Sequence, residues 1–277
     1  MSMTNSLSST IQPLTVGMRR WLLIGSIPPF LAGLSLFIGV EPWTIDPAIT
    51  AAFFGAAYWA GFFLLFLSSR QRAWAQARVA VSAVLAFTLL ELVATLRHLD
   101  RFHFDSTNGL ELVVTWGWMV PYVFGPVITI VLVARQLRVP GGSPPRRAPL
   151  PNWTRLVLSL QAAIMVALGA ALFIDPQGTG SLWPWMLTPL TGRIVGAWLV
   201  GLGVGAAHVV WENDWGRILA AAVSYTLLGA FLILALAGYS GAVDWGGPRA
   251  WVYLLFLLSL LGVGLYAWRG VRRASLG

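Results

Sequence analysis

Eight apolar stretches follow one another along the chain, and they constrain its fold more than any other feature. They cover roughly residues 21–40, 48–68, 77–98, 112–134, 154–174, 189–211, 216–238 and 250–268. A helix needs about 20 apolar residues to cross the ~30 Å hydrocarbon core of a bilayer. Within hydrocarbon a lone segment satisfies its backbone hydrogen bonds only as a helix. The sequence therefore predicts an all-α integral membrane protein with eight transmembrane helices.

The composition supports a membrane chain and argues against nucleic acid as a partner. Hydrophobic residues make up 57% of the chain and charged residues 10%, whereas a soluble domain carries about 25% charged residues. The lipid bilayer is therefore the first expected partner. The net charge of +8 comes from 18 basic residues, all of them arginine. Because these arginines lie in short loops beside apolar stretches, they indicate membrane topology and not nucleic-acid binding.

Missing residue types exclude several kinds of chemistry. The chain has no lysine and no cysteine, so it cannot form a Schiff base, a disulfide, an iron–sulfur cluster or a thiolate zinc site. Haem ligation by two histidines is excluded as well, because most of the hydrocarbon thickness separates His208 from His98 and His103. Intramembrane proteases use a serine–histidine pair or two aspartates within the membrane, and the sequence shows no matching residues. We expect no cofactor.

The arginines also predict the orientation of the chain. If the N terminus is cytoplasmic, fourteen of the 18 arginines lie on the cytoplasmic side, as membrane proteins prefer. Most of the acidic residues then lie on the opposite side. The sequence predicts a multi-pass protein of a bacterial-type cytoplasmic (plasma) membrane, with both termini in the cytoplasm.

The second half of the chain resembles the first at a spacing near 140 residues. Pro42-Trp43-Thr44-Ile45-Asp46-Pro47 resembles Pro184-Trp185-Met186-Leu187-Thr188-Pro189, and Trp74 matches Trp215. An even number of spans in each half predicts two tandem parallel four-helix repeats. The expected segments are a cytoplasmic tail (1–20), the first repeat (21–137), an Arg/Pro/Gly linker (138–153), the second repeat (154–269) and a C-terminal tail (270–277).

Glycine and proline distinguish the two halves. Gly192, Gly196, Gly201 and Gly205 predict close helix contacts along the sixth span. Pro28-Pro29 in the first span, and Pro121 and Pro126 in the fourth, predict kinks in the first half only. A cavity or moving part is therefore expected in the first half, and a tolerated kink is the alternative.

One face of the third span carries a polar stripe. Thr88, Glu91, Thr95 and His98 are spaced i, i+3, i+7 and i+10, which places all four on one side of a helix. A polar stripe cannot face lipid, so we expect it to face another helix or a wet cavity. An ionisable residue at this depth marks a candidate functional site. The alternative is that Glu91 is protonated or paired and serves only packing.

A charge pair across the seam between the repeats would join Glu91 to Arg193. At 1.5 Å per residue, Glu91 lies about 10 Å and Arg193 about 6 Å below the same membrane surface. The alternative is that Arg193 extends to the headgroups and Glu91 has no charged partner. Trp59 and Trp198 lie in mid-span at comparable repeat positions and complete the candidate binding residues, with core packing as their alternative role.

The loop after the third span gathers further ligand types. His98, His103 and Asp105, with Glu111 nearby, are a candidate metal-binding or acid–base cluster on the outer side. Their spacing matches no established ligand motif. The alternative is a loop whose charges are solvated.

Three classes of function stay open. The pattern favours transport or binding of a small-molecule ligand at the seam between the repeats. The first alternative is a non-catalytic accessory subunit with membrane-protein partners. The second is a membrane enzyme with an outer-face site of Glu91, His98, His103 and Asp105, although the sequence favours a protein that is not an enzyme.

Overall fold

The computed structural model describes residues 11–274, and all long elements within them are helices. Eight helical spans in that range are long and apolar enough to cross a membrane. This confirms the predicted all-α class and the number of spans, and it makes the chain a polytopic membrane protein in contact with lipid. The long helices are α1 (Val16–Gly25) and α2 (Ile27–Phe37), which together form the first span, and α3 (Ala48–Ser69), α4 (Arg78–Arg97), α5 (Gly109–Leu137), α6 (Asn152–Ile174), α8 (Pro189–Glu212), α9 (Leu219–Gly238) and α10 (Pro248–Ala274).

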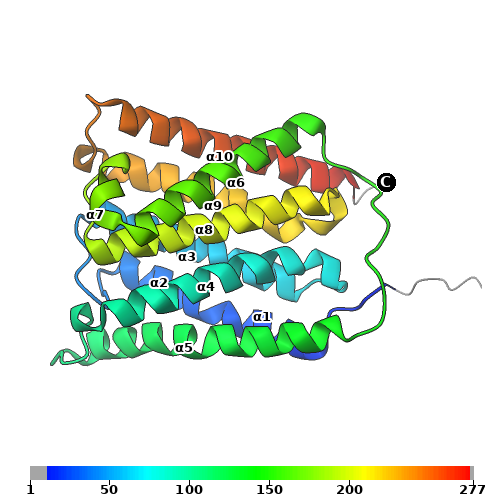
Figure 1. The fold of residues 1–277 in the computed structure, drawn as a ribbon, viewed down its shortest axis with the longest axis horizontal. Coiled ribbons are helices and arrows are strands. Elements are labelled where there is room, and N and C mark those ends of the chain that lie inside the picture. Colours follow the sequence, from blue (N-terminus) through cyan, green and yellow to red (C-terminus); the bar gives the residue numbers. More distant parts are fainter. Residues whose placement is uncertain (1–10, 275–277) are drawn as a thin grey trace, which may run out of the picture.

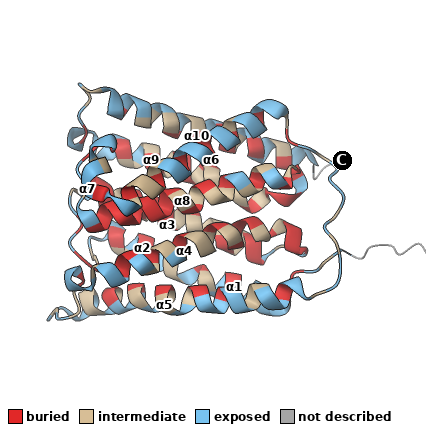
Figure 2. Cartoon of the chain, in the orientation of Figure 1, coloured by how far each residue is buried: buried red, intermediate tan, exposed pale blue. Residues whose placement is uncertain are grey.

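The long helices lie side by side, roughly along one axis (Figure 1). One end of the bundle carries the segment that joins α5 to α6, and we call it the linker end. The opposite end carries the short helix α7 (Pro176–Thr179), and we call it the α7 end. Buried residues concentrate on α3, α4 and α8, whereas α5, α6 and α10 present exposed outer faces, as lipid-facing helices do (Figure 2).

The prolines and caps shape the helix ends as local chemistry predicts. The first span begins at Val16, five residues before the predicted start at 21, and it breaks at Ser26. The break arises because Pro28 and Pro29 lack the N–H groups that would continue the ladder. At the start of α8, the Thr188 hydroxyl accepts a hydrogen bond from the Thr191 amide at 3.2 Å. Thr188 therefore caps α8 just before Pro189, an arrangement that both residue types favour. The similar pair Asp46-Pro47 does not act in this way, because α3 begins at Ala48 and has no side-chain cap.

Contacts between the halves run along two helix pairs, with α3 against α9 and α4 against α8. Within the second half, α6 packs on α8 and α9 on α10. Small residues permit these approaches, because a Cβ on Gly196 would lie 2.6 Å from the Gly169 carbonyl oxygen of α6. A Cβ on Gly201 would lie 2.8 Å from Cβ of Phe87 on α4. Both glycines therefore make the close contacts that the sequence predicts.

A buried carboxylate joins the halves at the linker end. Glu212, at the end of α8, has no exposed surface. It accepts two hydrogen bonds from Arg78 at the start of α4, one of them from Nη2 at 2.9 Å, and a third from Nη1 of Arg217 at 2.9 Å. Arg217 also donates to the Pro144 carbonyl of the linker. The cluster thus ties together both halves and the segment between them.

The linker is held firmly against the turn after α8. The Asp214 carboxylate accepts hydrogen bonds from the amides of Arg147 at 2.6 Å and Ala148 at 3.0 Å. Asn213 accepts from the Leu150 amide at 3.1 Å. These bonds satisfy backbone groups that lie outside any helix, so this part of the predicted linker is an ordered segment packed against the turn after α8.

Corresponding elements of the two halves are evenly spaced. Helices α4 and α9 are both 20 residues long and begin 141 residues apart, at 78 and 219. The short helices η1 (Trp74–Gln76) and η4 (Trp215–Arg217) precede them at the same separation. A duplicated four-helix unit would give this spacing. The duplication itself stays a prediction.

Replacing Glu212 by glutamine should strongly destabilise the fold, because it leaves two arginines without their buried counter-charge. Breaking a buried ion pair typically costs about 3–5 kcal/mol, and thermal unfolding in detergent would measure the loss. The matched control is Asp100→Asn, since the Asp100–Arg101 pair is exposed and should contribute little. Equal stability of the two variants would contradict a structural role for the cluster.

Candidate functional site

The polar stripe of α4 lies inside the protein, and its four residues meet different surroundings. Glu91 and Thr95 are fully buried. Thr95 accepts a hydrogen bond from the Trp118 indole at 3.3 Å. Thr88 faces a cavity within the first half, and His98 lies at the α7 end just after the last turn. The predicted inward face is confirmed, but the stripe does not line one site.

A cavity of about 540 Å³ lies chiefly among α1, α2, α3, α4 and α5. We call it the lateral cavity. Several of its wall residues are also exposed on the outside of the protein, including Ile27 and Leu31 of α2 and Val120 and Phe124 of α5. The cavity is therefore open sideways, toward the lipid, between α2 and α5. It lies in the half where the prolines predict one.

Glycines leave this space open. Gly25 of α1 and Gly117 and Gly125 of α5 all line the lateral cavity, and a Cβ on each would meet nothing within 4 Å. Other glycines, such as Gly196 and Gly229 of the second half, sit where helices touch. The first half thus has glycine at positions where a larger side chain would fill the void.

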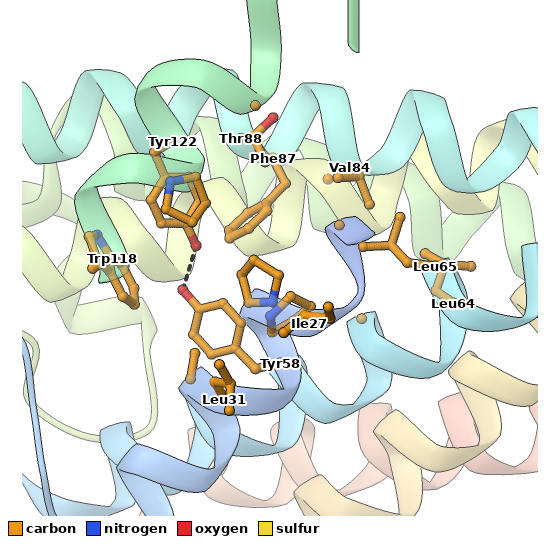
Figure 3. A pocket seen from close by; sticks show the side chains of 18 of the residues that line it. Ile27, Leu31, Tyr58, Leu64, Leu65, Val84, Phe87, Thr88, Trp118 and Tyr122 are labelled. Atoms are coloured by element: carbon orange, nitrogen blue, oxygen red, sulfur yellow. Dashed lines mark hydrogen bonds between the residues drawn. The ribbon is translucent and has the colours of Figure 1, made fainter. Parts of the chain in front are cut away.

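Two tyrosines supply the main polar contact in the cavity wall. The hydroxyls of Tyr58 on α3 and Tyr122 on α5 lie 2.7 Å apart and form a buried hydrogen bond (Figure 3). The indoles of Trp118 and Trp198 pack edge-on against the Tyr58 ring, with centroids 5.6 and 5.0 Å away. Apart from this pair and Thr88, the wall residues are chiefly aliphatic and aromatic. The surface suits an apolar ligand with few hydrogen-bonding groups.

The expected charge pair between Glu91 and Arg193 is wrong. Both carboxylate oxygens of Glu91 are buried and have no hydrogen-bond partner among the residues described. Arg193 instead donates from Nη1 to His98 Nε2 at 2.9 Å and to the Pro189 carbonyl at 3.2 Å. Its long side chain extends toward the helix end, which favours the alternative interpretation.

Glu91 is thus left buried and without a partner, and it is not one of the residues that line the lateral cavity. An unpaired carboxylate in hydrocarbon is unfavourable by several kcal/mol, so a buried acid of this kind holds a proton or meets a polar ligand.

The two mid-span tryptophans lie in different places. Trp198 of α8 lines the lateral cavity and stacks on Phe87, with ring centroids 4.0 Å apart. Trp59 of α3 does not line it. Its indole packs against Gly33 of α2 and the ring of Phe231 on α9. Trp198 remains a candidate binding residue, and Trp59 serves packing between the halves.

His98 and His103 do not assemble into a metal site. His98 meets Arg193, whereas His103 Nδ1 lies 3.3 Å from the Glu41 carbonyl oxygen. Within residues 11–274, no three histidine, cysteine, aspartate or glutamate residues, Asp105 included, come together as a metal site would require. The residues that the enzyme alternative would need, including His98, His103 and Asp105, are therefore not grouped as a metal site.

A serine–histidine pair that sequence reasoning missed lies at the linker end. Ser82 Oγ on α4 is 2.7 Å from His208 Nδ1 on α8, and His208 Nε2 is 3.4 Å from Glu212. The sequence spacing could have indicated this pair. Ser82 follows Arg78 by four residues and His208 precedes Glu212 by four, so in two antiparallel helices that pair Arg78 with Glu212 the other two residues also meet. Because Arg78 and Arg217 already occupy the Glu212 carboxylate, the pair extends the buried cluster.

No protein-family model, curated protein or solved structure matches the chain.

Removing either hydroxyl of the tyrosine pair should destabilise the protein, because its buried partner loses its hydrogen bond. We expect a loss of about 1–2 kcal/mol for Tyr58→Phe or Tyr122→Phe alone, and clearly less than the sum for the double variant. Thermal unfolding in detergent measures this cycle. Tyr266→Phe, on the outer face of α10, is the control and should be neutral. Additive losses would mean that the pair does not act as a unit.

Proposed function

We propose that the protein binds an apolar or weakly polar small molecule that enters the lateral cavity from the bilayer, between α2 and α5. The observation that carries the proposal is the sideways-open hollow of about 540 Å³ in the first half. Ligand sites in proteins typically have volumes of about 300–1,000 Å³, mostly apolar walls and a few polar groups. The lateral cavity has this character.

The polar groups suggest what such a ligand carries. A hydroxyl or carbonyl group on the ligand can insert into the hydrogen bond between Tyr58 and Tyr122, or bond to Thr88. Glu91 is buried without a partner and does not line the cavity, but a negative charge on it would disfavour an anionic ligand nearby. A neutral lipid-like molecule with one polar end meets both conditions.

The proposed position differs from the seam that the sequence favours. Only Trp198, Gly201 and Leu202 of α8 and Ser224 of α9 come from the second half to the cavity wall. The remaining wall belongs to the first half, whose kinked first span and proline-containing α5 are the elements best suited to move. Movement of these helices would turn binding into transfer across or along the bilayer.

We further propose that the two halves arose by duplication and that the first half diverged to open the cavity. The common separation of 141 residues between paired elements supports this. The reciprocal contacts of α3 with α9 and of α8 with α4 support it too, because a twofold axis would relate them.

The orientation that we propose places the linker end in the cytoplasm, as the arginine distribution favours. The chain has no cysteine, so single cysteines can be introduced without background. We expect Ser143→Cys, in the linker, to be protected from a membrane-impermeant thiol reagent in intact cells. Thr107→Cys, at the α7 end, should react. The reverse labelling pattern would overturn the orientation.

Filling the lateral cavity should abolish ligand retention without unfolding the protein. The change is Gly117→Leu combined with Gly125→Leu, since both positions border empty space and leucine favours a helix more than glycine does. The control is Gly262→Leu on α10, where a Cβ also meets nothing within 4 Å but the residue lies outside the cavity.

Native mass spectrometry and extraction of the purified protein measure the bound molecule. We expect the wild type and the control to retain one apolar ligand per chain, and the filled variant to lose it at undiminished thermal stability. Equal retention by all three would refute the proposal. The wild type and the control could instead retain a second membrane protein that the filled variant loses. That outcome would support the accessory-subunit alternative.

A further inference from the structure

A second hollow lies at the α7 end, between the two halves. It has a volume of about 290 Å³ and shares no wall residue with the lateral cavity. We call it the Arg193 recess. Its walls are Arg97 and His98 at the end of α4, Ile174 and Asp175 at the end of α6, Pro176 and Gln177 of α7, and Pro189 and Arg193 of α8.

Arg193 brings to this recess a positive charge that forms no salt bridge with a carboxylate in the described part of the chain. The residue is only 8% exposed, and both of its hydrogen bonds go from Nη1 to uncharged acceptors, His98 and the Pro189 carbonyl. Arg217, the other arginine classed as buried within residues 11–274, lies 2.9 Å from the carboxylate of Glu212. A buried cation without a salt-bridged partner is unfavourable. The Asp175 carboxylate in the same wall forms no salt bridge with it, so Arg193 favours a further anion.

The neighbouring groups leave the recess positive. His98 accepts from Arg193 at Nε2, so its ring is neutral and carries its proton on Nδ1. Burial, together with the nearby Arg193 guanidinium, lowers the pKa of His98 and keeps it neutral. Asp175 is the one acid in the wall, and its Oδ1 already accepts from the Gly178 amide at 2.9 Å. The recess therefore contains two positive charges, on Arg97 and Arg193, and one negative charge, on Asp175.

The donors that remain match an anion with several oxygens. Arg193 keeps Nε and Nη2 without a hydrogen bond inside the described part of the chain, and Arg97 can turn its exposed guanidinium over the opening. A guanidinium binds two oxygens of a phosphate through parallel N–H groups. The ends of transmembrane helices lie at headgroup depth, where phosphate groups are abundant.

We propose that the Arg193 recess binds a phosphate group, supplied by a phospholipid headgroup or by free phosphate. The bound group bonds to Arg193 and Arg97 together, and so bridges α4 of the first half and α8 of the second. Binding therefore stabilises the seam at the α7 end, as Glu212 does at the linker end.

Thermal unfolding of the full-length, delipidated protein in detergent tests this site. The three probes are inorganic phosphate at constant ionic strength, a short-chain phosphatidic acid, and a diacylglycerol with the same chains. We expect saturable stabilisation by one or both of the phosphate-containing probes and none by the diacylglycerol. Stabilisation by inorganic phosphate identifies a free-anion site, and stabilisation by phosphatidic acid alone identifies a headgroup site.

Two substitutions and a control locate the effect. Arg193→Gln should weaken binding about tenfold or more, and Arg97→Gln, at an exposed position that the fold does not need, should weaken it severalfold. Arg101→Gln is the control, because that exposed arginine at the same end lies outside the recess and pairs with Asp100. If Arg193→Gln does not fold, Arg97→Gln alone decides. Absence of saturable stabilisation by any phosphate probe, or unchanged binding in the variants that fold, overturns the proposal.

Discussion

The antiparallel contact between α4 and α8 holds the two halves in register, and the buried carboxylate of Glu212 anchors it. Arg78 at the start of α4 meets Glu212 at the end of α8. One helical turn further along α4, Ser82 meets His208, one turn back along α8. A buried acid bonded to arginines from both halves tolerates no slip of one helix past the other, because a slip would leave charges without partners.

The same contact positions both candidate sites. Near its middle the Phe87 ring packs against Trp198, one of the residues that the second half contributes to the lateral cavity wall. At its far end His98 meets Arg193 and closes one side of the Arg193 recess. A ligand at either site therefore contacts both halves. The binding energy of such a ligand can stabilise or shift the seam.

Glycine serves two purposes in this bundle. Gly196 lets the backbone of α8 approach Gly169 of α6, whereas Gly117 and Gly125 of α5 border the empty space of the lateral cavity. An unfilled apolar void forfeits dispersion contacts along its whole lining. A bilayer component that filled the void would restore those contacts.

The sequence by itself determined the features that depend on neighbouring residues. The eight spans follow from the length of apolar chain that a bilayer requires, the start of α8 from Thr188 and Pro189, and the inward face of α4 from its helical spacing. It also placed Glu91 and Arg193 at comparable depths. Only the tertiary structure decided that Arg193 meets His98 and that Glu91 has no partner. Depth follows from residue number, but the direction in which a side chain points depends on how each helix is rotated and packed, and contacts between distant segments decide that.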